Sequence, residues 1–148
     1  MKIHFPYTLL LLTIIYSSLI GYLYTEQSLF RSLNITIVSL VIICFGLILG
    51  LWVRKTILSY STTLNPDGIP TKLVVSGPFR YSRNPMYLSY LIVALGVSVY
   101  AKTPLAFIGP LFYFLYLNYR IIPKENQNLS SKFHSAYHEY KKSVRKWI

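Results

Sequence analysis

Four long apolar stretches dominate the chain, and short polar segments separate them. They cover residues 5–24, 33–53, 86–101 and 104–122, and none of them contains an aspartate or a glutamate. An α-helix rises 1.5 Å per residue, so about 20 apolar residues cross the roughly 30 Å hydrocarbon core of a bilayer. The pattern therefore predicts an all-α integral membrane protein with about four transmembrane helices.

The last two stretches are separated only by Lys102-Thr103. A connection this short predicts a tight antiparallel helical hairpin in the C-terminal half. The stretch 86–101 is short for a full span, so we expect the hairpin to be tilted or incompletely spanning. At 148 residues the chain has room for one membrane domain, 1–148, in which residues 54–85 form a loop and residues 123–148 a tail.

Composition agrees with a membrane location. The chain is 53% hydrophobic and only 13% charged, whereas an average soluble domain carries about 25% charged residues. Its formal net charge of +11 would suit nucleic acid or an anionic membrane face. The apolar stretches favour the membrane, so we expect the lipid bilayer to be a partner and nucleic acid not to be one.

The basic residues predict the orientation. With four spans, the N-terminus, the loop 54–85 and the tail 123–148 share one side. That side carries every lysine and arginine except Arg31 and Lys102. Because short loops rich in Lys and Arg stay in the cytoplasm, we expect both termini and this loop to be cytoplasmic.

The tail shows a periodic apolar pattern of its own. Six apolar or aromatic residues recur every three or four positions, which predicts one face of an amphipathic helix. Such a helix can lie in the headgroup region or can pack as a lid over the loop 54–85, and the periodicity does not separate the two. The residues are Leu129, Phe133, Tyr137, Tyr140, Val144 and Trp147.

The stretch VSGPFRYSRNPMY (75–87) carries the first candidate chemistry. Pro85 suits the first turn of the third apolar helix, and Asn84 suits the N-cap position before it. Free N–H groups at this helix start, beside Arg80 and Arg83, would suit a carboxylate or phosphate. Both arginines are equally explained as cationic residues that flank a cytoplasmic helix end.

Glu125 is the second residue position with candidate chemistry. It is one of four acidic residues in the chain and follows the fourth apolar stretch. In a helical hairpin this position lies near Arg83 and Asn84. Glu125 then either forms a simple salt bridge or accepts the ammonium group of a ligand. We expect no metal site, because His134 and His138 have no evident third ligand.

The stretch LVVSGPFRYSRNPMYLSYLIVALG resembles the signature of the isoprenylcysteine carboxyl methyltransferase and phospholipid methyltransferase superfamily, in the form found in bacterial members. The resemblance runs from Thr71 to Ile148, because a second block in the tail matches as well. This second block consists of Glu125, Leu129, Phe133, Tyr137, Tyr140, Val144, Arg145 and Trp147.

The resemblance implies a methyl donor, S-adenosyl-L-methionine, and a set of residues that hold it. It implies that Glu125 engages the amino end of the cofactor, and we expect Arg83 to hold its carboxylate. Arg120 lies near the basic position that prenylcysteine enzymes use for their acceptor. The implied cofactor-binding residues are Thr71, Lys72, Leu73, Val74, Phe79, Asn84, Pro85, Met86, Tyr87 and Glu125.

The resulting hypothesis is a multi-pass enzyme of the bacterial inner membrane. It would transfer a methyl group from S-adenosyl-L-methionine to an amphiphilic or lipid-like acceptor. The favoured acceptor is a carboxylate, such as that of a prenylated cysteine or a related small molecule. Two alternatives are an NAD(P)H-dependent membrane reductase and a non-catalytic membrane scaffold. The sequence identifies neither the acceptor nor the oligomeric state.

Overall fold

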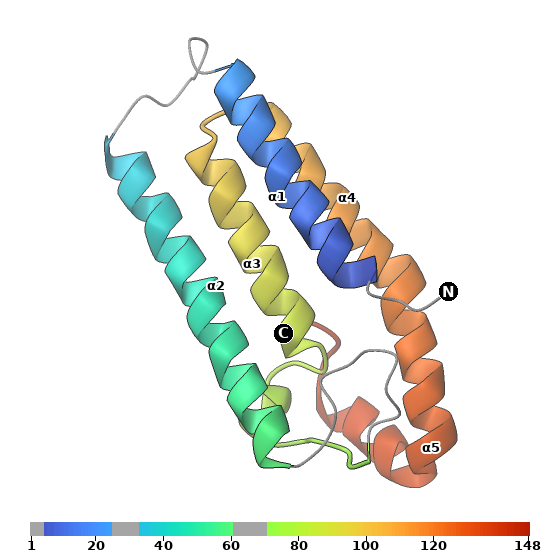
Figure 1. Cartoon of the computed structure of the whole chain (residues 1–148). Helices are drawn as coiled ribbons and strands as arrows, with labels where there is room; N and C mark the ends of the chain where they lie inside the picture. The colour runs from blue at the N-terminus through green and yellow to red at the C-terminus, as the bar shows by residue number, and fades with distance from the viewer. Residues whose placement is uncertain (1–4, 25–32, 61–70) are drawn as a thin grey trace.

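In the computed structural model, residues 5–24, 33–60 and 71–148 are described, and all regular structure within these ranges is helical. This confirms the all-α fold class. The α-helices are α1 (Phe5–Leu23), α2 (Leu33–Ser59), α3 (Pro85–Tyr100), α4 (Ile108–Tyr116) and α5 (Ile122–Ser143) (Figure 1). Shorter elements are the 3₁₀ helices η2 (Gly77–Arg80) and η3 (Pro104–Phe107) and the π-helix η4 (Leu117–Ile121).

Three helical runs are long and apolar enough to cross a membrane: α1, α2 and the run from η3 to α5. The third run has 40 residues and is therefore about 60 Å long, twice the hydrocarbon thickness. Only its apolar first part, residues 104–121, fits the bilayer, and α5 extends beyond it. The fourth predicted span, α3, is apolar but has 16 residues.

The helices α2, α3, α1 and α4 lie side by side, with α3 packed against both α2 and α1 (Figure 1). Between α3 and η3 the chain turns through Lys102, whose φ is 57°. The predicted hairpin of α3 and α4 is therefore present. At this turn Ser17 of α1 and Ser98 of α3 both donate hydrogen bonds to the carbonyl of Ala106, at 3.0 and 2.9 Å. These bonds tie the closed end of the hairpin to α1.

Glycines bring α2 and α3 into close contact. A Cβ added at Gly46 would lie 2.8 Å from Cγ2 of Val93, and one added at Gly96 would lie 2.6 Å from Cγ1 of Ile43. Small residues are used in this way between membrane helices, since they let two backbones approach closely. The contact fixes the position of α3, whose first residues adjoin the candidate site.

The predicted end of the second helix is wrong. α2 continues to Ser59, so Arg54 and Lys55 are helical rather than part of the loop. Both have straight side chains that lose little rotamer freedom in a helix. The predicted loop therefore begins after α2. Its residues 61–70, the N-terminal residues with Lys2 and the segment with Arg31 lie outside the described residues.

The tail is not one straight amphipathic helix. His134 has φ 41° and ψ −116°, and α5 bends back at this point (Figure 1). The helix ends at Ser143, so Val144 and Trp147 lie in non-helical chain beyond it. All six residues of the predicted stripe are nevertheless buried or half-buried. The bend and the non-helical end, rather than a single helical face, turn them inward.

Candidate active site

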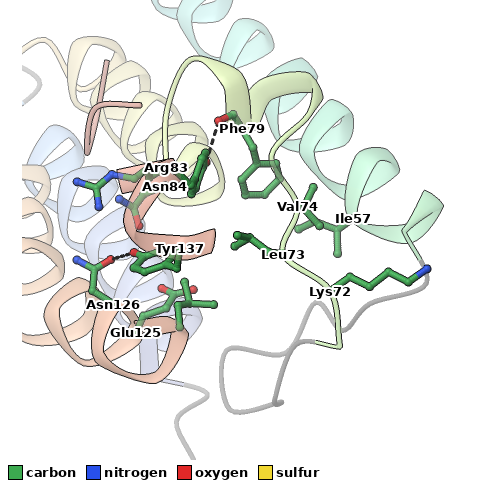
Figure 2. A pocket seen from close by; sticks show the side chains of 12 residues that line it. Ile57, Lys72, Leu73, Val74, Phe79, Arg83, Asn84, Glu125, Asn126 and Tyr137 are labelled. Atoms are coloured by element: carbon green, nitrogen blue, oxygen red, sulfur yellow. Dashed lines mark hydrogen bonds between the residues drawn. The ribbon is translucent and has the colours of Figure 1, made fainter. Parts of the chain in front are cut away.

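A glycine turn shapes the first wall of the site. Gly77 has φ +58°, in the region that favours glycine, and a Cβ here would lie 2.9 Å from Oγ1 of Thr56 on α2. Pro78 follows at the start of η2. The turn therefore lies against α2, and it directs Phe79 into the pocket described below (Figure 2). The carbonyl of Phe79 accepts a hydrogen bond from the hydroxyl of Tyr140 at 2.8 Å.

The start of α3 forms the second wall. Asn84 occupies the N-cap position and Pro85 the first helical position, as predicted. The predicted capping interaction is absent, because the side chain of Asn84 makes no hydrogen bond to the backbone of α3. Its Nδ2 donates a hydrogen bond to the carbonyl of Lys146 at 2.8 Å. The C-terminal segment thus replaces the backbone of α3 as the partner of this amide.

A pocket lies between these two walls, the end of α2 and both parts of α5. It contains about 630 Å³ of empty space, part of which is open to solvent. Five aliphatic or aromatic residues and five polar or charged ones line it, together with two tyrosines. The lining residues are Ile57, Lys72, Leu73, Val74, Phe79, Arg83, Asn84, Glu125, Asn126, Leu129, Tyr137 and Tyr140 (Figure 2).

Arg83 and Glu125 have buried polar atoms that are not satisfied. Nε and Nη1 of Arg83 and Oε2 of Glu125 lack hydrogen-bond partners within the part of the chain that the structure describes. The hydroxyl of Tyr137 donates to Oδ1 of Asn126 and lies close enough to Arg83 to interact with it. The hydroxyl of Tyr87 interacts with Glu125 in the same way. The two charged groups are therefore held by neighbours but retain free hydrogen-bonding capacity.

Burial governs the electrostatics of these groups. It raises the pKa of the Glu125 carboxyl, and the nearby hydroxyl of Tyr87 partly opposes this shift. The pKa of Lys146 is lowered by desolvation and then by the charge of Arg83. A buried charge without a full set of partners costs free energy. A ligand that carries both an ammonium and a carboxylate would relieve Glu125 and Arg83 together.

Many of the residues predicted from the sequence line this pocket, and others do not. Tyr87 is buried but does not line the pocket, and Arg120 is exposed on η4. Thr71, Pro85 and Met86 are outside the lining as well. The predicted residues that line the pocket are Lys72, Leu73, Val74, Phe79, Arg83, Asn84 and Glu125.

Sequence reasoning missed other lining residues. Leu129, Tyr137 and Tyr140 were predicted to share one face of an amphipathic tail helix, but that pattern does not distinguish packing from a ligand site. Asn126 carried no signal beyond its position next to Glu125. Ile57 lies beyond the predicted end of the second helix and could be found only once α2 was seen to continue.

Comparison with known proteins identifies related sequences. A family model described as phospholipid methyltransferase matches residues 34–136, more than half of the chain. The matched range includes most of the pocket lining and both Arg83 and Glu125. A protein of Haemophilus influenzae, described as uncharacterized, is 36% identical over 63 residues, which is 43% of this chain and 100% of that protein.

Proposed function

The chain belongs to the phospholipid methyltransferase family, and from this premise we propose that it transfers a methyl group from S-adenosyl-L-methionine to an amphiphilic acceptor. Membership implies a membrane methyltransferase, and the long apolar helices agree with an integral membrane protein. The methyl donor, the acceptor and the roles of individual residues are our proposal.

The observation that carries the proposal is the pairing of unsatisfied Arg83 and Glu125 atoms in one pocket. The amino-acid end of S-adenosyl-L-methionine carries a carboxylate and an ammonium. The guanidinium of Arg83 would bind the carboxylate, because its planar N–H groups suit that geometry. Oε2 of Glu125 would accept a hydrogen bond from the ammonium. Two opposite charges in the ligand thus meet two opposite charges whose buried atoms keep free hydrogen-bonding capacity among the described residues.

The remaining walls suit the rest of the donor. Leu73, Val74 and Phe79 form an apolar surface in the pocket, with Ile57 from α2 beside them (Figure 2). An adenosyl group has a flat ring system that packs well on such a surface. The pocket thus combines a charged end with an apolar wall, the mixture that small-molecule sites commonly show.

The chemistry supplied by the bound donor is a methyl group on a positively charged sulfur, which an acceptor atom can displace. The protein has to orient the reactants and exclude water, and such positioning accounts for several kcal/mol of a typical rate enhancement. Arg83 and Glu125 would fix the donor end, while Tyr87 keeps the carboxyl of Glu125 in place. No proton has to move if the acceptor is an ionised carboxylate.

We therefore favour a carboxylate on a lipid-like molecule, such as a prenylated cysteine, as the acceptor. Lys72 lies at the edge of the pocket on the side away from Arg83, and its ammonium points outward (Figure 2). The whole chain carries a net charge of +11, which attracts anionic amphiphiles to its surface. Arg120, exposed on η4, is available to an acceptor that approaches from the bilayer. The site would face the cytoplasm, with both termini on that side of a bacterial inner membrane.

The test is binding of S-adenosylhomocysteine to the purified protein in detergent, measured by calorimetry. We expect saturable binding to the wild type and weaker binding to Glu125→Gln. Glu139→Gln is the matched control, because Glu139 is an exposed acid on the same helix. Absence of binding to the wild type would contradict the proposed donor. Equal binding to both variants would contradict the role of Glu125. A screen of prenylcysteine analogues and membrane lipids with a radiolabelled methyl donor would then identify the acceptor.

A further inference from the structure

The last five residues, 144–148, are non-helical and follow α5, and they form what we call the C-terminal strap. Two of its carbonyls hold neighbouring residues of the pocket wall. The carbonyl of Arg145 accepts from the backbone N–H of Arg83 at 3.1 Å. The carbonyl of Lys146 accepts from Nδ2 of Asn84 at 2.8 Å. The strap therefore contacts the site from outside the pocket.

The strap is fixed at one point of the π-helix η4. Nζ of Lys146 donates to the carbonyl of Asn118 at 3.2 Å, and Nε1 of Trp147 lies 3.5 Å from Oδ1 of the same residue. The ring of Trp147 also packs on Phe114 of α4, with centroids 5.3 Å apart. Two consecutive side chains of the strap thus hold one asparagine.

The local sequence explains why the Asn118 carbonyl is available. In η4 the N–H of Ile122 donates to the carbonyl of Leu117, five residues earlier. The same pattern would pair the carbonyl of Asn118 with residue 123. That residue is Pro123, which has no N–H. The carbonyl is left without a helical partner and accepts the ammonium of Lys146 instead.

We propose that Lys146 and Trp147 are positioning residues of the methyl-donor site, which act by holding Arg83 and Asn84 in place. This inference rests on the proposed function. Neither side chain lines the pocket, so both act through the backbone of the strap. The strap also lies beyond residues 34–136, the range that the family model matches. The buried guanidinium of Arg83 lacks partners on two nitrogens, so a fixed backbone sets where it meets a ligand.

The sharpest test is Pro123→Ala, which alters neither the pocket lining nor any charge. The new N–H competes with Lys146 for the Asn118 carbonyl, so the strap should detach. We expect S-adenosylhomocysteine to bind about five- to tenfold more weakly, the effect of losing about one hydrogen bond. The thermal midpoint should change little, because the helical hydrogen bond that alanine restores offsets the contacts that the strap loses. Pro104→Ala is the matched control, since Pro104 is exposed at the far end of the hairpin.

Fluorescence of Trp147, in a Trp52→Phe background, reports strap docking separately from ligand binding. Detachment should expose the indole and shift its emission to longer wavelength. Lys146→Met should weaken binding as Pro123→Ala does, and Lys146→Arg, which keeps a donor, should restore it.

The outcomes separate the two proposals. If the wild type does not bind S-adenosylhomocysteine, the proposed function is wrong and the positioning role falls with it. If the wild type binds and both Pro123→Ala and Lys146→Met bind equally well, only the positioning role is overturned. Weaker binding to both variants, with unchanged thermal midpoints and binding restored in Lys146→Arg, supports it.

Discussion

The proposed role of Arg83 leads to the most demanding prediction, because it concerns one end of the ligand. Nε and Nη1 of Arg83 are buried and lack partners among the described residues. A carboxylate can accept from either nitrogen, and a hydrogen bond to a charged group is worth about 1.5–3 kcal/mol. Losing one such interaction weakens binding by about 10- to 150-fold. Arg83→Met should therefore weaken S-adenosylhomocysteine binding by a factor in this range.

The assay compares two ligands by calorimetry in detergent. S-adenosylhomocysteine carries the amino-acid end, whereas 5′-methylthioadenosine lacks both the carboxylate and the ammonium. Arg83→Met should weaken the binding of S-adenosylhomocysteine and leave the affinity for 5′-methylthioadenosine within about twofold of the wild-type value. Arg83→Lys should fall between, because a lysine keeps the charge without the planar pair of donors.

Arg80→Met is the control, since Arg80 is an exposed arginine three residues earlier that does not line the pocket. It should bind both ligands like the wild type. Equal losses of affinity for both ligands in Arg83→Met would show that Arg83 maintains the shape of the pocket rather than binding a carboxylate. No loss for either ligand would refute the placement of the ligand altogether.

Three further results are expected. Glu125→Gln should raise the thermal midpoint of the ligand-free protein at pH 7: burial raises the pKa of Glu125 above 4.5, so its charge costs stability as pH rises through the folded pKa. This gain in thermal midpoint should disappear near pH 4.5, and an equal gain at pH 7 and at pH 4.5 would contradict the explanation. Tyr87→Phe removes the hydroxyl that interacts with Glu125 and should weaken the binding of S-adenosylhomocysteine about fivefold in calorimetry. Gly46→Ala should destabilise the protein by about 1–3 kcal/mol in thermal unfolding, because its Cβ would lie 2.8 Å from Cγ2 of Val93. Gly50→Ala, whose Cβ would meet only a serine side chain at 3.2 Å or more, should cost less.

The helical fold could be predicted because apolar runs of this length have few alternatives in a bilayer. The sequence also predicted the hairpin and the start of α3, where Pro85 and a short polar turn leave little choice. It misplaced the end of α2, since charged side chains such as Arg54 signal a boundary by polarity although their helix propensity is high. Polarity marks where a helix leaves the membrane, which is not where the helix ends.

The path of the tail was harder to predict from the sequence, because it depends on contacts between residues that are distant in sequence. His134 adopts a positive φ, which no local pattern indicates for a histidine. The bend turns Tyr137 and Tyr140 toward the pocket, and spacing alone had assigned them to a continuous face. The periodicity had left open whether this face lies in the headgroup region or packs over the loop 54–85, and in the structure both tyrosines are buried.

Asn84 shows why a motif can mark a site before it explains the chemistry there. Its position before Pro85 suggested a cap, and the family resemblance suggested a contact with the methyl donor. In the structure it lines the pocket, yet its Nδ2 is bonded to the carbonyl of Lys146. That carbonyl is in place because Lys146 is held by Asn118, and Asn118 is available because Pro123 has no N–H. The asparagine of the motif and the proline beyond the hairpin thus belong to one chain of contacts. A substitution at Pro123 should consequently weaken the hydrogen bond of Asn84 to the Lys146 carbonyl, although no local pattern in the sequence connects the two residues.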